Sequence, residues 1–205
     1  MSQVIVFDYD GTLVDTVPGI WAEFKRVRNE MGLHEVSYHD FCMHVGKPWA
    51  KVLKGLWPDV DVSEFSAAYD KQAEGVKPVA GGPEALAALH ERFMLCLLTS
   101  RGGGSLFSDL PGAGYDVGLF NMVFQRDNMD VHKPDPAVFA HAARMLSVNA
   151  GDLVYVGDAV VDARSAIDAR LRFIGVLSGA ATEDDFRSLG VKEIVDSVAD
   201  LPDYL

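Results

Sequence analysis

The sequence predicts a doubly wound α/β fold with a mainly parallel sheet and a helical segment inserted after the first strand. Three observations lead to this prediction. Short apolar runs recur along the chain, each bounded by polar or glycine-rich sequence, as is typical of buried parallel strands. Segments with helical periodicity alternate with these runs, which is the pattern of doubly wound folds. The alternation is interrupted once, between residues 16 and 79, where no convincing strand occurs.

Four apolar runs are predicted to form the strands, and a fifth, weaker run is added to them. They are VIVF at 4–7, MLCLL at 94–98, LVYV at 153–156, FIGVL at 173–177 and, as the weaker one, MVF at 122–124. Runs of this length and composition suit strands that are covered on both faces.

Two segments between the strands are predicted to be amphipathic helices. In PEALAALHER, residues 83–92, Pro83 suits the first turn of a helix. In DPAVFAHAARML, residues 135–146, Asp135 suits the N-cap. Both segments carry an apolar stripe that can cover a sheet.

The interrupting region is predicted to be a helical insertion. Glycine or proline separates four periodic segments, VPGIWAEFKRVRNEMG, YHDFCMHVG, PWAKVLKGLW and SEFSAAYDKQAEG. The segment PVAGGP at 78–83 is expected to be the hinge through which the chain returns. The expected organisation is an α/β core, residues 1–15 and 80–205, and a helical domain, residues 16–79.

Composition and charge restrict the function. At 205 residues, 49% hydrophobic and 23% charged, the chain is typical of a globular protein. The net charge of −12 argues against a nucleic-acid-binding face, which needs a basic footprint. The apolar runs are too short to span a bilayer and the first residues do not resemble a signal peptide, so the expected location is cytoplasmic, without a membrane partner. Cys42 and Cys96 are expected to stay reduced. The oligomeric state remains open.

Polar residues of unusual types follow the predicted strands at their carboxyl ends, the edge where open α/β sheets bind ligands. Ionised carboxylates repel one another, so the acidic members of this group need a cation, a shared proton or open water. The residues are Asp8, Asp10, Thr99, Ser100, Lys133, Asp158 and Asp162.

This combination indicates phosphoryl transfer with a metal ion. Magnesium takes one or two carboxylates together with substrate phosphate oxygens, so Asp8 and Asp158 are candidate ligands of a Mg²⁺ cofactor. A carboxylate can also attack phosphorus directly. Thr99 or Ser100, with Lys133, would hold the oxygens of the transferring group. The expected partner is a small phosphorylated metabolite.

The motifs DYDGTLVDT, TS after a buried strand, KP and GDAVVD, in this order, resemble the four motifs of the haloacid dehalogenase-like hydrolase superfamily. The segments GGPEALAAL, KPDPAVFAHAARML and FIGVLSG are similar to its phosphoglycolate phosphatase-like branch. The resemblance covers nearly the whole chain. It implies a Rossmann-like core, with the helical insertion as a cap over the active site.

The resemblance also implies roles for the two aspartates of the first motif. Asp8 would be the nucleophile that becomes phosphorylated. Asp10 would protonate the leaving alcohol, activate the hydrolytic water and lend its backbone carbonyl to magnesium. This acid is typically absent from relatives that cleave carbon–halogen or carbon–phosphorus bonds, so its presence favours phosphate esters.

The remaining motifs supply the other implied roles. Thr99 would contact the phosphoryl group, with Ser100 nearby, and Lys133 would bridge nucleophile and phosphate. Asp158 would be a metal ligand, and Asp162 would hold a metal-bound water. Structural interpretations stay open beside these: a turn hydroxyl for Thr99, a solvated lysine for Lys133 and a helix cap for Asp162.

In the insertion, VGKPW at 45–49 is the candidate specificity loop. Lys47 would pair with a substrate carboxylate or sugar oxygen, or would be a solvated turn lysine. His44 and Trp49 are interpreted as packing residues, and Asp15 as a cap of the first inserted helix.

Two departures from the family pattern limit the match to the phosphoglycolate branch. After TS the chain has RGGGS, a flexible sequence in which Arg101 either contacts an anion or points to solvent. Arg170 stands where a glycine usually ends the helix before the last core strand, so a shifted helix end is expected.

The function predicted from the sequence is hydrolysis of a small phosphomonoester, phosphoglycolate or a sugar phosphate, through an aspartyl phosphate at Asp8. The main alternative is a sugar phosphomutase of the same fold, similar to β-phosphoglucomutase, because the core motifs do not distinguish the two. From a different class, a phospho-accepting signalling domain is also considered. In such a domain the lysine follows the last aspartate, whereas Asp158 follows Lys133 here.

Overall fold

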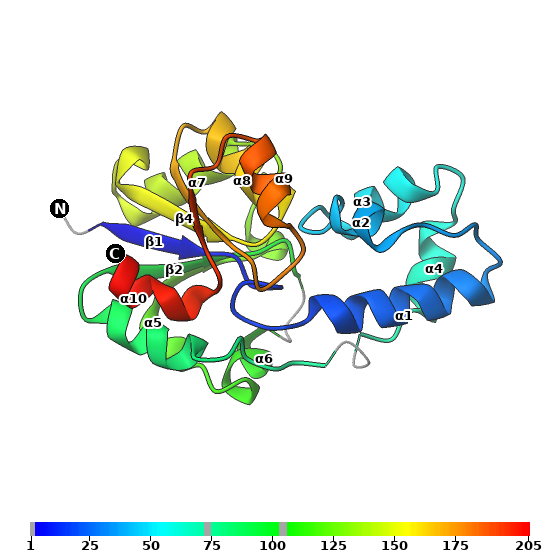
Figure 1. The fold of residues 1–205 in the computed structure, drawn as a ribbon, viewed down its shortest axis with the longest axis horizontal. Coiled ribbons are helices and arrows are strands. Elements are labelled where there is room, and N and C mark those ends of the chain that lie inside the picture. Colours follow the sequence, from blue (N-terminus) through cyan, green and yellow to red (C-terminus); the bar gives the residue numbers. More distant parts are fainter. Residues whose placement is uncertain (1–2, 72–74, 103–105) are drawn as a thin grey trace.

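The computed structural model describes residues 3–71, 75–102 and 106–205. Within these residues, six parallel strands form one sheet in the order β3-β2-β1-β4-β5-β6 (Figure 1). The strands are β1 Val4–Phe7, β2 Met94–Leu98, β3 Phe120–Phe124, β4 Leu153–Gly157, β5 Arg172–Val176 and β6 Glu193–Val195. The prediction of a doubly wound α/β fold is confirmed.

All five predicted runs are strands, but β6 was not predicted. It consists of the three residues Glu193–Val195, which are only half-buried at the edge of the sheet. Such a short strand with a charged residue has no apolar run that distinguishes it from a loop. Its pairing with β5 is therefore a consequence of the tertiary fold.

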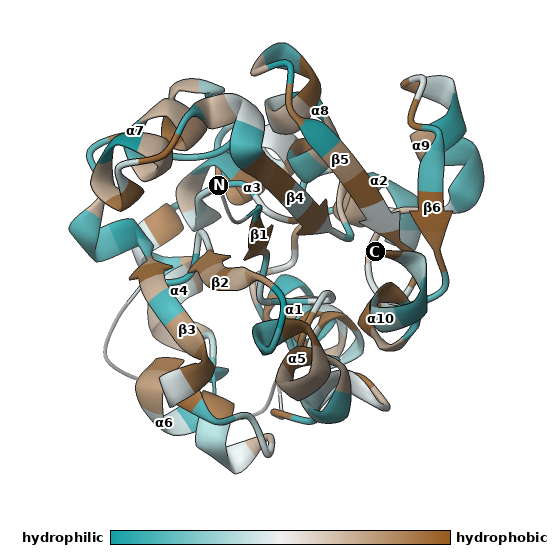
Figure 2. Cartoon of the chain, turned by 90° about the vertical axis from the view of Figure 1, so that its left-hand side faces the viewer, coloured by the Kyte–Doolittle hydropathy of each residue, from teal (hydrophilic) through white to brown (hydrophobic). Residues whose placement is uncertain are grey.

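Helices cover both faces of the sheet. Figure 2 shows α7 and α8 on one side and α5 and α10 on the other. On the first side, α9 also packs into the hydrophobic cluster, and on the second side α6 does. These helices are α5 Gly82–His90, α6 Leu106–Gly112, α7 Ala137–Leu146, α8 Val160–Asp168, α9 Glu183–Ser188 and α10 Leu201–Tyr204. Short 3₁₀ turns are η2 Val117–Leu119, η3 Arg126–Asn128, η4 Ala150–Asp152 and η5 Val198–Asp200.

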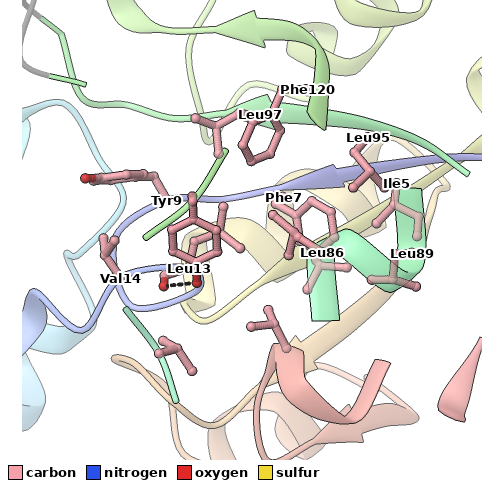
Figure 3. Close-up of a cluster of buried hydrophobic side chains, with 14 of the residues drawn as sticks. Ile5, Phe7, Tyr9, Leu13, Val14, Leu86, Leu89, Leu95, Leu97 and Phe120 are labelled. Atoms are coloured by element: carbon pink, nitrogen blue, oxygen red, sulfur yellow. Dashed lines mark hydrogen bonds between the residues drawn. The ribbon is translucent and has the colours of Figure 1, made fainter. Parts of the chain in front are cut away.

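Strand β1 divides its side chains between two hydrophobic clusters. Ile5 and Phe7 face the cluster beneath α5, where Leu86 and Leu89 pack (Figure 3), and the alternate residues of β1 face the cluster beneath α7 and α8. Burying each of these side chains contributes about 1.5–3 kcal/mol. The central strand is thus fixed from both sides, which makes its carboxyl end a rigid place for a functional site.

The region after β1 folds as four helices that lie together beside the sheet, toward the arrowhead of β1 (Figure 1). They are α1 Val17–Glu30, α2 Tyr38–Cys42, α3 Trp49–Leu56 and α4 Val62–Ala68. The helices α2 and α4 end earlier than predicted, and residues 72–74 of the predicted fourth segment lie outside the described residues. We call α1–α4 and their connections, residues 17–71, the insertion.

Aromatic rings hold the insertion together. Phe24 of α1 is fully buried, and its ring lies 5.0 Å from that of Trp57 and 4.9 Å from that of Phe41. Phe65 of α4 closes the group at 5.6 Å from Phe24. Ring pairs at these separations stabilise packing beyond their buried area. These side chains belong to a third hydrophobic cluster, which also includes Ala159 and Ala180 from the carboxyl edge of the sheet.

The two chain segments that lead into and out of the insertion run side by side. The Asp15 N–H donates to the Lys77 carbonyl, and the Val79 N–H donates to the Leu13 carbonyl, both at 2.8 Å. Asp15 is exposed and its interpretation as a helix cap is wrong, because Thr16 is the N-cap of α1 and no side chain caps that end. The Thr16 hydroxyl is engaged elsewhere, as described below.

Two other local predictions are modified by the structure. The N-cap of α7 is Pro136 rather than Asp135, although the Asp135 carboxylate accepts a hydrogen bond of 2.9 Å from the Ala137 N–H. Helix α8 ends at Asp168 without a shift, because Arg170 itself adopts the left-handed conformation, with φ of 58°.

None of the helices in the described ranges is both long and apolar enough to cross a membrane. The longest of those named above, α1, has 14 residues and a charged face.

Candidate active site

The reversal of strand order places two aspartates next to each other. From β1 the chain proceeds outward to β2 and β3, and it then returns to β4 on the other side of β1. Asp8 follows β1, and its N–H donates to the Val156 carbonyl of β4 at 2.9 Å, while Asp158 follows β4 directly. Ligands bind at such a reversal point in open α/β sheets.

Three carboxylates gather at this edge. Asp8, Asp158 and Asp162 are buried, and one carboxylate oxygen from each lies within 4.8 Å of the others. Burial raises the pKa of Asp8 to about 7 even though Lys133 counteracts the shift. Burial, with the charges of Asp162 and Asp8, raises the pKa of Asp158 well above its usual value. The excess of buried negative charge and the oxygen donors fit a hard divalent cation.

Lys133 lies among these carboxylates. Its Nζ is 2.9 Å from Asp8 Oδ1 and 2.7 Å from Asp162 Oδ1, and it donates to the Tyr155 hydroxyl at 2.9 Å. Burial alone would lower the pKa of Lys133, but Asp162 and Asp8 outweigh it and raise the pKa. The lysine is therefore a buried cation and not a solvated loop residue.

Asp162 is held through both oxygens. Oδ1 accepts from Lys133 and from the Tyr155 hydroxyl at 2.9 Å, and Oδ2 accepts from the Ala159 N–H at 3.1 Å. Asp162 thus caps the start of α8, as the structural interpretation proposed, and also orients Lys133. Its predicted contact with a metal-bound water stays a prediction.

Asp158 lies in a cradle made by glycines. Its oxygens accept from the Thr12 hydroxyl at 2.9 Å and from the Ala180 N–H at 2.8 Å. A methyl group on Gly11 would lie 2.2 Å from Asp158 Oδ2, and one on Gly179 would lie 2.0 Å from it. Gly11 also has φ of +75°, so both its conformation and its close approach require glycine.

Asp10 lies apart from the three buried carboxylates and is paired with Arg101. The Arg101 Nη2 donates to Asp10 Oδ1 at 2.6 Å and its Nε donates to Oδ2 at 3.1 Å. The Thr16 hydroxyl donates to the same Oδ1 at 2.7 Å. Arg101 therefore does not point freely to solvent but pairs with Asp10, and its contact with a substrate anion stays a prediction. The glycines 103 and 104 of the same loop lie outside the described residues.

A cavity of about 310 Å³ opens above the carboxylates, between the sheet edge and the insertion. Asp8, Asp10 and Thr99 line its floor. Ser100 also lines it, and its hydroxyl donates to the Gly46 carbonyl of the insertion at 2.6 Å. Lys47 of the insertion lines it as well, with Nζ 3.0 Å from His44 Nδ1. The structure thus brings every predicted site residue to one cavity or to the cluster beneath it.

Several residues of this site were not predicted. The aromatic residue Tyr155 was assigned only to a strand, and Gly179 and Ala180 were not considered. For Arg101 the sequence offered a contact with an anion, but not the pairing with Asp10. Trp49 was interpreted as a packing residue, yet it lines the cavity as well as packing against the insertion.

Comparison with known proteins agrees with this geometry. The family model of the haloacid dehalogenase-like hydrolases matches residues 5–176. A protein named phosphoglycolate phosphatase from Psychrobacter arcticus is 27% identical over 224 residues, covering 100% of this chain and 96% of that protein. One of the same name from Cereibacter sphaeroides is 31% identical and covers 82% of both chains. The crystal structure of a hydrolase from Pseudomonas syringae has a TM-score of 0.85 at 23% identity, covering 98% of this chain and 97% of the other.

The chain belongs to the haloacid dehalogenase-like hydrolases. The predicted family and its phosphoglycolate phosphatase-like branch are confirmed, as is the prediction of a hydrolase of the phosphatase type.

Proposed function

We propose that this protein is a magnesium-dependent phosphatase that hydrolyses a small phosphomonoester through an aspartyl phosphate at Asp8. The observation that carries the proposal is the position of Lys133, which joins Asp8 and Asp162 below a cavity that also exposes Asp10 and Thr99. A nucleophilic carboxylate, a neutralising cation and a second carboxyl for proton transfer are the groups that this chemistry needs.

The chain's own residues account for the bonds that change. An Asp8 carboxylate oxygen attacks phosphorus while the ester P–O bond breaks, and the departing alcohol oxygen takes a proton from Asp10. A water molecule that gives a proton to Asp10 then attacks phosphorus, and the bond to Asp8 breaks to release inorganic phosphate. Lys133 fixes the Asp8 carboxylate, and Thr99 lies beside it at the end of β2.

Magnesium would be held by Asp8 and Asp158, with Asp10 contributing its backbone carbonyl. Bound there, it would polarise phosphoryl oxygens and neutralise developing charge. Asp162 would act through Lys133, which its carboxylate holds, and through a water bound to the metal. The contact between Ser100 and Gly46 supports a role of the insertion as a cap that closes over the substrate.

The test is phosphate release from a panel of small phosphomonoesters, with Mg²⁺ and with chelator. We expect magnesium-dependent release that Asp8→Asn abolishes and that Asp15→Asn, an exposed carboxylate near the same turn, leaves intact. Undiminished release from the Asp8 variant would refute the mechanism. Conversion of a hexose phosphate into its isomer without release of phosphate would indicate a mutase instead.

A further inference from the structure

The two sides of the cavity differ in chemical character. The apolar side chains that line it all come from the insertion; they are Ile20, Phe41, Val45, Trp49, Val52 and Tyr69. The lining residues from the sheet edge are polar, charged or glycine. The side of the cavity that would receive the leaving alcohol therefore carries an apolar wall with aromatic rings, beside which Lys47, Ser66 and Lys71 of the insertion also line the cavity.

This wall matches a sugar poorly. Besides Thr99, the lining residues with neutral hydroxyls are Ser66, Ser100 and Tyr69. The hydroxyls of Ser66 and Ser100 already donate to backbone carbonyls, those of Val62 and Gly46, at 2.6 Å. Sugar hydroxyls packed against the ring faces and aliphatic side chains would lose hydrogen bonds to water that these surfaces do not replace. The apolar wall thus selects against the sugar phosphates.

The wall also extends beyond what a two-carbon acid can cover. A cavity of about 310 Å³ lies in the range of sites that enclose ligands with a sizeable apolar body. Trp49 and Tyr69 form one part of the wall, with ring centroids 4.9 Å apart and planes inclined at 60°. A flat ring can pack against such a pair, whereas the short chain of phosphoglycolate leaves it in contact with water.

Cations remain at the cavity after the catalytic groups are paired. Lys133 neutralises Asp8 and Arg101 neutralises Asp10. Lys47 has no carboxylate within salt-bridge distance in the described part of the chain, and its Nζ contacts only the His44 ring nitrogen among the bonds found there. Lys71 also lines the cavity, as does Arg126, whose Nε lies 3.4 Å from Asp127 Oδ1. This excess of positive charge calls for an anionic group on the substrate besides the phosphate.

We infer that the substrate is a phosphomonoester of an alcohol that carries an aromatic ring and a second anionic group, with the ring against Trp49 and Tyr69 and the anion at Lys47. This inference rests on the proposed phosphatase function and narrows its substrate class. It places phosphoglycolate and hexose phosphates among the poorer substrates.

The first test compares kcat/KM, with Mg²⁺, for four primary phosphate esters: phosphoglycolate, glucose 6-phosphate, benzyl phosphate and the 4-carboxy derivative of benzyl phosphate. Their leaving groups are all primary alcohols, so differences in kcat/KM reflect how the enzyme recognises the alcohol rather than how readily the alcohol leaves. We expect the carboxylated ring ester to rank first, about tenfold or more above phosphoglycolate. Asp8-dependent release that is fastest with phosphoglycolate or glucose 6-phosphate overturns the inference and leaves the proposed function standing.

Two variants test whether Trp49 recognises the ring of the substrate and Lys47 its second anionic group. Trp49→Leu is expected to lower kcat/KM for the ring esters about threefold to tenfold more than for phosphoglycolate. Its control is Trp21→Leu, a ring of the same cluster that does not line the cavity. Lys47→Met is expected to remove the preference for the carboxylated over the plain ring ester, and the exposed Lys51→Met to keep it. If Lys47→Met lowers kcat/KM equally for both ring esters, the lysine contacts the phosphate. That result would overturn the inference that the substrate carries a second anionic group.

A binding measurement keeps the inference testable if no ester is hydrolysed, an outcome that would overturn the proposed function. Titration calorimetry compares 4-carboxybenzylphosphonate with phosphonoacetate, both of which resist hydrolysis. Tighter binding of the ring compound, weakened by Trp49→Leu, supports the inference. Equal or weaker binding of the ring compound overturns it.

Discussion

The sheet edge and the insertion wall fix their side chains by different means. At the sheet edge, buried charges are held by hydrogen bonds at defined distances, such as those between Lys133, Asp8 and Asp162. On the wall, Trp49 and Tyr69 are held by contact with other rings. Hydrogen bonds are directional and hold the side chains in one geometry, as a chemical step requires. Packed rings instead present a surface that selects a substrate by its shape. Chemistry and selectivity therefore lie in separate regions of one cavity.

The largest expected effect is that of removing the nucleophile. Asp8→Asn should lower kcat by at least about 10⁴-fold for every ester alike, because the lost group acts on the phosphoryl end that all esters share. Initial rates of phosphate release across the four esters measure this. If the loss of kcat differed between esters of different alcohols, chemistry and substrate selection would not be separated between the sheet edge and the insertion wall. Unfolding in denaturant, without metal, should show no loss of stability, since the variant removes a buried carboxylate whose pKa is raised.

Asp10→Asn should have a smaller effect that depends on the leaving group. The carboxyl is oriented by Arg101 and Thr16, and it supplies the proton that an alcohol needs to depart. The loss should be on the order of 10²–10⁴-fold with benzyl phosphate and markedly less with 4-nitrophenyl phosphate, whose phenolate leaves without a proton. Asp15→Asn serves as the control. Equal losses with both esters would exclude the acid role.

Sequence patterns could predict the sheet edge in more detail than the wall. Asp8, Thr99, Lys133 and Asp158 follow strands that their apolar runs identify, and parallel strands bring their carboxyl ends to one edge. The wall has no such rule, because its residues come from several helices of the insertion and the turns beside them, whose mutual packing depends on Phe24 and its neighbours. The same limit applies to β6, which has no apolar run, and to Tyr155, whose hydroxyl only the tertiary structure brings to Lys133.

Magnesium should stabilise the folded protein by binding to the carboxylates at the sheet edge. A ligand present at a hundred times its Kd adds about 2.7 kcal/mol to the free energy of unfolding. Thermal unfolding with Mg²⁺ and with chelator measures the shift. Asp158→Asn should lose it, and Asp168→Asn, an exposed carboxylate at the far end of α8, should keep it. An undiminished shift in the Asp158 variant would place the metal elsewhere.

The magnesium effect should also grow with pH. The folded-state pKa of Asp8 is raised to about 7, so protonation stabilises the metal-free fold, and that contribution is lost as the pH rises through about 7. Protons and Mg²⁺ compete for the same carboxylates. The thermal shift should therefore be larger at pH 8 than at pH 6, and the opposite trend would exclude Asp8 from the metal site.

The smallest expected effect is on stability alone and lies at the end of α8 that is remote from Asp162. Arg170 has φ of 58°, and its N–H and that of Leu171 close the helix on the carbonyls of Ile167 and Ala166, both at 2.9 Å. A side chain in this conformation is strained, so Arg170→Gly should raise the free energy of unfolding by about 0.5–1 kcal/mol, measured in urea. Arg170→Ala, which removes the same side chain but keeps the strain, should bring no comparable gain. Neither variant touches the sheet edge, so kcat should stay constant in both. A change in kcat would show that the position of α8 is coupled to the carboxylates at its other end.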